Sequence, residues 1–314
     1  MQTSASKRQR VDPIAVAVPI RSDIWFADGN IVIQAQDTQF RVYKGPLCNA
    51  SPVLKTAVED LGDSKGVEGC PLLHLTDSST DVACVLRTIF DRWSYPDDEP
   101  VPFEVITAFM RLGRKWRMKA LYRSALARLC YAFPASREEY VCNRAETRIL
   151  FRDHISKQRE IVVDTIALAR ELDLPFLLPA AFWLAATRLD YLAKDHTNTI
   201  SSADRGAILS AVNPLRIAYA KYLYGWLDGN SPDCTTGQEC NAKKVKYALE
   251  VWKPPGIFLV FTWYSNATKG MCQSCAAAGR KHHSEGGERL WRELPSFFGL
   301  PSWDELLAAK NRDF

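Results

Sequence analysis

Apolar and polar positions near the start of the chain first repeat every second residue and then at helical spacing. Ile31 and Ile33 lie on one side of an alternating segment, which is the period of a β-strand. Residues that tolerate reversed backbone conformations flank this segment, so turns separate three short strands. Ser51 and Pro52 favour the N-cap and the first helical position, and Gly62 favours a helix end. The strands are expected at 24–26, 31–34 and 40–42, and the helix at 52–61.

The next part of the chain predicts one more strand and then helices. An apolar run at 72–75 indicates the strand. Ser78, with Asp81 three residues later, has the spacing of a capping box, and the apolar side chains behind it recur at helical spacing through Phe90. Strands first and paired helices afterwards are typical of an α+β unit. Two further helices are expected around 105–112 and 121–129. Six side chains should be largely buried: Trp25, Phe40, Leu75, Ile89, Phe109 and Leu129.

Six short motifs follow one another through this unit. They are Asp23 at the head of the first strand, residues 43–47 after the third, Ser-Pro at 51–52, Leu-Thr-Asp at 75–77, Phe90 at a helix end, and residues 112–121 at a helix junction. In this order they resemble the BTB/POZ family over about residues 21–132. Tyr43 stands where the family has histidine, and Leu54 where it has phenylalanine. Residues 21–34 and 294–301 look most like fungal proteins that join such a domain to a helical region.

The resemblance implies a protein–protein interaction module rather than an enzyme. Members often recruit a client to a cullin ubiquitin-ligase scaffold through an apolar-x-Glu element, which maps to Ala57, Val58 and Glu59. They also often form homodimers by exchanging a strand and a helix that precede the Asp-led strand. About twenty residues precede Asp23 here, so a monomer and a homodimer both stay open. A nuclear transcription-regulatory scaffold is the alternative, supported by the Lys-Arg-Gln-Arg run at 7–10.

The chain predicts four segments. Residues 1–20 are expected to be a disordered tail, 21–132 the BTB/POZ-like domain, 133–230 a helical region, and 231–314 a cysteine-containing module. Capping pairs that begin at Ser136 and Ser201 mark helices in the third segment. The run Asp-Gly-Asn-Ser-Pro at 228–232 breaks the helical pattern. The fold class is therefore α+β, followed by a mainly α-helical region and a small tail.

Composition limits the partners and the compartment. The net charge of +4 comes from interspersed acidic and basic residues, so direct nucleic-acid binding is not expected. No apolar run is long enough to span a bilayer, and the first ten residues are too polar for a secretory signal. The protein is therefore expected inside the cell, in the nucleus or the cytoplasm. In a reducing compartment, the nine cysteines should be thiols or metal ligands rather than disulfides.

Four cysteines in the tail have a spacing that suits a metal. Cys234 and Cys240 form a Cys-x5-Cys pair, and Cys272 and Cys275 form a Cys-x2-Cys pair thirty-one residues later. Two such pairs can close a tetrahedral structural zinc site, with His282 or His283 as a substitute for one cysteine. The alternatives are four unlinked thiols, or a redox Cys-x-x-Cys, which needs a thioredoxin-like setting.

No catalytic constellation stands out in the sequence. It contains neither a Gly-x-Ser-x-Gly elbow nor a Walker loop. His74 lies between leucines and is expected to be a satisfied core or edge histidine. An unrecognised enzyme within 133–314 is the alternative of another class, and a strongly perturbed histidine or cysteine in a deep pocket would indicate it. The other five cysteines, expected to be small buried thiols, are Cys48, Cys70, Cys84, Cys130 and Cys142.

Overall fold

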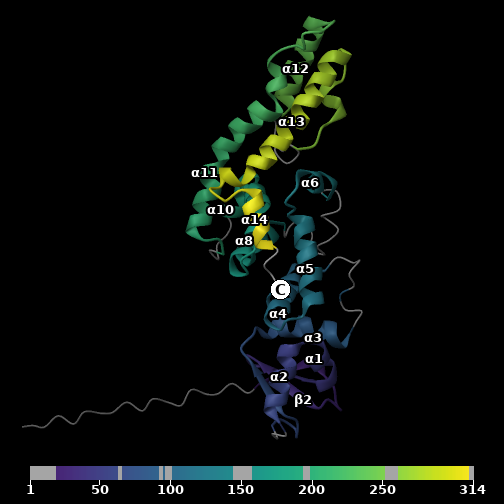
Figure 1. Ribbon diagram of the computed structural model, residues 1–314, viewed down its shortest axis with the longest axis vertical. Coiled ribbons are helices and arrows are strands. Elements are labelled where there is room, and N and C mark those ends of the chain that lie inside the picture. The colour runs from purple at the N-terminus through teal and green to yellow at the C-terminus, as the bar shows by residue number, and fades with distance from the viewer. Residues whose placement is uncertain are drawn as a thin grey trace, which may run out of the picture. The chain divides into compact units, whose positions relative to one another are not determined.

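The computed structural model describes residues 19–62, 66–91, 95, 101–143, 158–193, 199–251 and 261–310. This part of the chain is mixed α and β and mostly helical, with a small four-stranded sheet (Figure 1). No helix within it is long and apolar enough to cross a bilayer. The basic run at 7–10, and all but the last two residues of the expected N-terminal tail, lie outside the described residues.

The chain forms two compact units. The first comprises residues 1–96 and 112–118, and the second comprises 97–111 and 119–314. Helix α4 (Phe103–Lys115) contributes to both units, and α5 (Lys119–Ala132) belongs to the second. The second unit also takes in both the helical region and the cysteine-containing tail, which the sequence separates at residue 230.

The sheet of the first unit contains all four expected strands. They are β1 (Ile20–Trp25), β2 (Ile31–Ala35), β3 (Thr38–Val42) and β4 (Leu72–Leu75), in the spatial order β1-β3-β2-β4. The β2–β3 pair is antiparallel, whereas β1–β3 and β2–β4 are parallel. Ile31, Val32 and Ile33 of the inner strand β2 are all fully buried. Side chains therefore cover both faces of β2.

Three helices pack beside this sheet (Figure 1), namely α1 (Lys44–Ala50), α2 (Pro52–Leu61) and α3 (Ser79–Phe90). The predicted start of α2 is confirmed, because the Ser51 hydroxyl accepts a hydrogen bond from the backbone N–H of Leu54. Its predicted end is confirmed as well: Gly62 has a φ of 56°, which favours glycine. The Ser78 side chain does not form the N-cap hydrogen bond expected of it. Its hydroxyl pairs with that of Thr80, 2.7 Å away, and caps no backbone N–H.

Three of the six residues expected to be largely buried lie in the core. Phe40, Phe109 and Leu129 are enclosed as predicted. Trp25, Leu75 and Ile89 are less enclosed and keep part of their surface in contact with solvent. Trp25 and Leu75 end β1 and β4, the two outer strands of the sheet, and Ile89 lies in the last turn of α3. At such positions packing from one side leaves the other side open.

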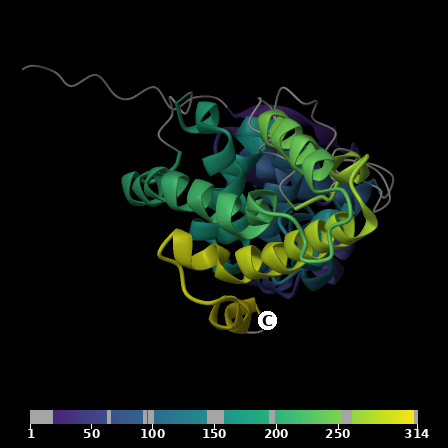
Figure 2. The ribbon, with the colours of Figure 1, turned by 90° about the horizontal axis from the view of Figure 1, so that it is seen from above.

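The second unit is helical throughout its described part. After α4 and α5 come α6 (Arg137–Asn143), α8 (Gln158–Glu171), the 3₁₀ turn η2 (Pro175–Leu177), α9 (Leu178–Thr187), α10 (Leu189–Ala193) and α11 (Ser202–Ala218). The π-helical turn η3 (Tyr219–Leu223), the 3₁₀ turn η4 (Gly225–Asp228), α12 (Gly237–Val251), the 3₁₀ turn η6 (Ser265–Thr268), α13 (Gln273–Phe297) and α14 (Trp303–Lys310) follow. Figure 2 shows the long helix α13 alongside α11.

Helix α13 approaches η3 more closely than side chains normally allow. A Cβ atom added at Gly286 would lie 1.7 Å from the carbonyl oxygen of Tyr222. Only glycine lets the two backbones meet at this distance. Deeper in the same unit, the indole N–H of Trp183 donates to the hydroxyl of Tyr219 at 2.6 Å, and the Trp183 ring meets Tyr140 edge-on.

Candidate metal centre

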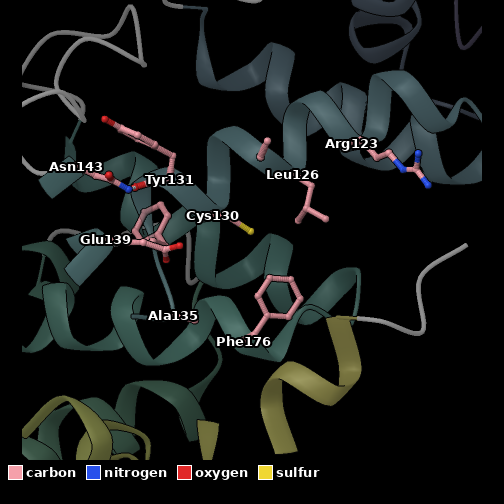
Figure 3. A pocket seen from close by; sticks show the side chains of 10 residues that line it. Arg123, Leu126, Cys130, Tyr131, Ala135, Glu139, Asn143 and Phe176 are labelled. Atoms are coloured by element: carbon pink, nitrogen blue, oxygen red, sulfur yellow. Dashed lines mark hydrogen bonds between the residues drawn. The ribbon is translucent and has the colours of Figure 1, made fainter. Parts of the chain in front are cut away.

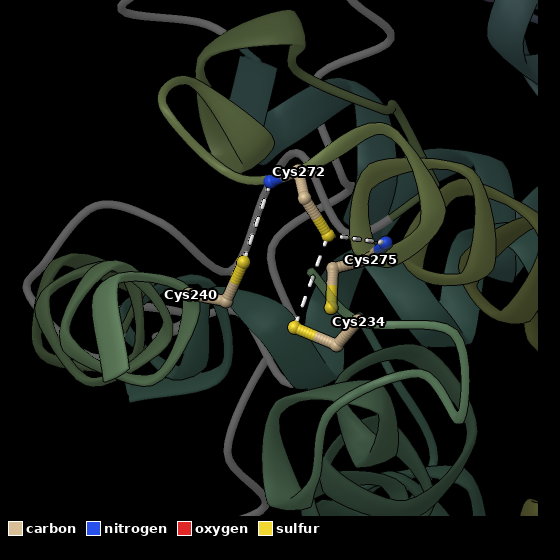
Figure 4. A group of neighbouring side chains, drawn as sticks. All are labelled: Cys234, Cys240, Cys272 and Cys275. Carbon is tan, nitrogen blue, oxygen red and sulfur yellow. Dashed lines mark hydrogen bonds between the residues drawn. The ribbon is translucent and has the colours of Figure 1, made fainter. Parts of the chain in front are cut away.

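Four cysteine sulfurs gather at one point in the second unit. The Sγ atoms of Cys234, Cys240, Cys272 and Cys275 all lie within 4.8 Å of one another. Figure 4 shows the four side chains turned toward a common centre. A tetrahedral ion with Zn–S bonds of about 2.3 Å needs sulfurs about 3.8 Å apart. The Cys234 and Cys272 sulfurs already have that separation, 3.8 Å.

Three different segments present these thiols. Cys234 lies in the loop after η4, and Cys240 lies in the first turns of α12. Cys272 is the N-cap of α13, and Cys275 lies in the first turn of that helix. The Cys-x2-Cys pair therefore lies where a turn runs into a helix. The looser Cys-x5-Cys pair reaches the same point because Cys234 lies in the loop after η4 and Cys240 lies near the start of α12.

Backbone N–H groups point at the sulfurs. The N–H of Ser231 donates to Cys275 Sγ at 3.4 Å, and the N–H of Cys272 donates to Cys240 Sγ at 3.3 Å. The N–H of Cys275 donates to Cys272 Sγ at 3.5 Å, so this thiol caps α13. Hydrogen bonds to a charged acceptor are stronger than those to a neutral one. This ring of donors therefore favours thiolates, the form that binds metal.

Three of these thiols, Cys234, Cys240 and Cys272, have pKa values that differ from the ordinary value for cysteine. The backbone N–H groups of Cys275 and Thr235 lower the pKa of Cys272 to about 6. The Thr236 hydroxyl and the Cys272 N–H lower the pKa of Cys240. Burial raises the pKa of Cys234 to about 12. Cys272 therefore loses its proton more readily than Cys234 does.

The two histidines considered as substitute ligands do not join the cluster. His282 Nε2 lies 3.3 Å from the carbonyl oxygen of Lys221. His283 is buried, with its ring 5.3 Å from that of Trp263 and 6.4 Å from that of Tyr224. Both follow Cys275 by about two turns of α13, which carries them away from its N-terminus. The candidate site therefore consists of four cysteines.

The remaining cysteines lie apart from this cluster. None of the nine, all of which fall in the described residues, forms a disulfide. Only Cys70 of the other five is buried. Cys48, Cys84 and Cys130 are half-buried and Cys142 is exposed, so the expectation of small buried thiols was wrong for these four. Apolar neighbours in the sequence do not ensure burial on a helix that is covered on one face only.

The other residues singled out in the sequence lie in the first unit. In α2, Val58 is buried in the core, Ala57 is half-buried and Glu59 is exposed. The Glu59 carboxylate lies 3.9 Å from the Lys55 ammonium one turn earlier. His74 is exposed on β4, on the opposite face of the strand from the buried Leu73. The expected element thus offers Ala57 and Glu59, but not Val58, to a partner.

One cleft in the second unit was not expected from the sequence. It has a volume of about 440 Å³, and ten residues from α5, α6, η2 and the adjoining turns line it. Figure 3 shows Cys130 and Phe176 near its middle, with Arg123 at one end and Glu139 at the other. Its lining includes a single carboxylate, that of Glu139, and no histidine.

Comparison with models of known protein families, with curated proteins and with solved structures finds no match to this chain.

Proposed function

We propose that this chain is a non-enzymatic protein–protein interaction module. In this proposal a BTB/POZ-like first unit binds partners, and a structural zinc ion holds the cysteine-containing end of the second unit. The module acts as an adaptor or scaffold, and one form of it recruits a client to a cullin ubiquitin-ligase scaffold. The proposal rests on the way the motifs of the family resemblance meet within the first unit.

Motifs that lie far apart in the sequence are bonded to one another in that unit. The buried Ser51 hydroxyl, at the Ser-Pro helix start, donates to the carbonyl oxygen of Trp116 at 2.6 Å. Trp116 lies in the helix-junction motif. From the same motif, the Lys115 ammonium pairs with the carboxylate of Asp77, also at 2.6 Å. Asp77 ends the Leu-Thr-Asp motif, so three motifs form one connected structure.

The aromatic positions of the resemblance also come together. The rings of Tyr43 and Phe90 lie 6.2 Å apart, and Phe26 packs on both, at 5.1 Å and 5.4 Å. Tyr43 stands where the family has histidine, and here its ring packs against the other two. A departure from the family pattern is therefore accommodated without loss of packing, which supports a divergent BTB/POZ-like unit.

The cysteine cluster supports a structural metal. Four protein ligands fill a tetrahedral zinc shell and leave no open position for a substrate. The ligands come from a loop and two helix starts, so the ion would tie α12, α13 and the loop after η4 together. Metal binding of this kind supplies folding free energy directly. In this proposal the cysteines with shifted pKa values are ligands of a structural metal rather than catalytic nucleophiles.

Elemental analysis of the purified chain tests the metal. We expect close to one zinc per chain, lost in Cys272→Ser, with increased protease sensitivity of residues 231–295 and an intact first unit. Cys142→Ser removes an exposed thiol outside the cluster and should leave the zinc content unchanged. Metal-free wild-type protein with a protease-resistant tail would refute the structural zinc.

Binding of a purified cullin scaffold protein tests the adaptor form. We expect micromolar or tighter binding, and we expect Ala57→Arg to abolish it without changing the circular dichroism spectrum. Asp60→Arg places the same side chain at an exposed position of α2 and serves as the control. Equal loss in both variants, or no binding by the wild type, would rule out this element. Light scattering of the same samples distinguishes a monomer from a homodimer.

A further inference from the structure

Lys244 is a buried lysine in a helix that otherwise looks solvated. Its side chain belongs to α12, and the residue is 3% exposed. The ammonium donates to the carbonyl oxygen of Trp226 at 2.9 Å and to that of Gly229, and it lies 5.7 Å from the centre of the Trp226 ring. Within the described part of the chain, Lys244 forms no ion pair with a carboxylate.

A buried charge without a partner of opposite sign is costly. Carbonyl dipoles and an aromatic face offset only part of the desolvation of an ammonium. The group that can carry negative charge on the same helix face is the cysteine cluster, because Cys240 precedes Lys244 by four residues. Side chains at this spacing are neighbours on a helix, with Cβ atoms about 5–6 Å apart.

One of the two carbonyl groups that Lys244 binds, that of Gly229, lies next in the chain to residues that contact the cysteine cluster. Gly229 precedes Asn230, whose side-chain oxygen lies 3.8 Å from Cys275 Sγ, and Ser231, whose N–H donates to that same sulfur. The Asn230 amide also donates to the carbonyl oxygen of Gly237 at 3.1 Å, which closes the loop that carries Cys234. Lys244 therefore fixes the segment that shapes one side of the site.

We propose that Lys244 is the counter-cation of the metal centre. Four thiolates around one Zn²⁺ carry a net charge of −2, and the buried ammonium offsets part of it while holding residues 229–231 in place. The proposal rests on the proposed structural zinc. It assigns a role to a residue that is neither a ligand nor exposed, and it explains why a lysine is buried one helical turn after Cys240.

Zinc affinity of the full chain tests the charge. Lys244→Gln keeps a hydrogen-bond donor near the two carbonyls and removes the ammonium. In a competition with a chromophoric chelator at fixed pH and salt, we expect at least about tenfold weaker binding, the scale of charges roughly 10 Å apart at an effective dielectric of about 20. Lys246→Gln makes the same change of charge at an exposed position of α12 and should change the affinity by less than about twofold.

A double-mutant cycle separates charge from structure. Cys234→His replaces a thiolate by a neutral ligand and lowers the net charge of the centre to −1. If the ammonium acts through charge, Lys244→Gln should weaken zinc binding clearly less in the Cys234→His background than in the wild type. A purely structural role for Lys244 predicts equal losses in the two backgrounds, and equal losses would overturn the proposal.

The outcomes also separate this proposal from the zinc site itself. Wild-type protein that takes up no zinc refutes the metal centre, and with it any counter-cation. Zinc-loaded wild type with an unchanged affinity in Lys244→Gln refutes only the role of Lys244. Should Lys244→Gln fail to fold, Lys244→Arg decides: an affinity within about threefold of wild type supports the charge, and a loss of zinc binding overturns it.

Discussion

The contact between α13 and η3 predicts a large effect from one methyl group. In Gly286→Ala the new Cβ would meet the Tyr222 carbonyl oxygen at 1.7 Å, whereas ordinary contacts exceed 3.4 Å. Neither atom can rotate away, because both are fixed to helical backbone. The two elements must therefore separate by more than an ångström at this point.

The energy of that separation can be worked from the packing. Alanine gains about 1 kcal/mol over glycine in a helix interior. Against this, overpacking typically costs about 1–3 kcal/mol, with the upper end expected where backbone must move. Opening the interface also exposes part of Leu223 and Leu290, both now fully buried, and each buried leucine contributes about 1.5–3 kcal/mol. We expect a net loss of about 3 kcal/mol or more in the free energy of unfolding of the second unit.

Urea denaturation followed by circular dichroism measures this loss. With a slope of about 2–3 kcal/mol per molar, the midpoint of the helical transition should fall by about 1 M or more. The matched control is Gly206→Ala, since Gly206 lies in α11 and nothing stands within 4 Å of an added Cβ. That variant should gain about 0.5–1 kcal/mol. If Gly286→Ala is as stable as Gly206→Ala, the two backbones do not meet as described.

Three further predictions concern other parts of the core. Leu86→Asp places a charge at a fully buried position of α3, so the first unit should unfold while proteolysis still finds the helices of the second intact. Burial raises the pKa of Tyr219 well above its ordinary value, so the phenol loses its proton at a lower pH in the unfolded chain than in the folded one. The free energy of unfolding should therefore decline as the pH rises above 10. This decline should be smaller in Tyr219→Phe, which has no proton to lose. Arg170 makes two hydrogen bonds to the buried carboxylate of Asp204, at 2.6 and 3.1 Å, so Arg170→Met should lower the unfolding free energy by about 1.5–3 kcal/mol in a thermal or urea melt.

Features set by neighbouring residues could be predicted from the sequence. The strand positions follow from alternation and turn residues, and the start and end of α2 follow from Ser51 and Gly62. The N-cap at Ser201 is likewise confirmed by its hydrogen bond from the N–H of Asp204. These signals depend on a few consecutive residues, so no knowledge of the remaining fold is needed. The four cysteines are a different case: the pattern of two pairs predicts their grouping, although thirty-one residues separate the pairs.

Features set by distant parts of the chain could not be predicted. The half-burial of Trp25 and Leu75 depends on β1 and β4 being the outer strands of the sheet. The order of strands in a sheet cannot be predicted from the sequence of any single strand. Lys244 lies among charged residues, so its sequence surroundings predict an exposed side chain. In the structure, η4 and the following loop bury it. In the sequence, Gly286 is a residue that destabilises a helix interior. Only the position of the Tyr222 carbonyl explains why a glycine is needed there. The signal that could have pointed to it is a glycine inside a helical pattern.

The arrangement of the cysteines also bears on the order in which the second unit is assembled. Cys272 and Cys275 occupy a single helical turn at the start of α13, so this pair can capture an ion before any distant contact exists. The length-dependent cost of then closing the thirty-one-residue connection to Cys240 is about 3 kcal/mol. Each thiolate that reaches the captured ion offsets part of that cost. In the proposed zinc-bound form, early uptake of the metal would therefore guide α12 toward α13, and chains without the metal would close this connection less readily.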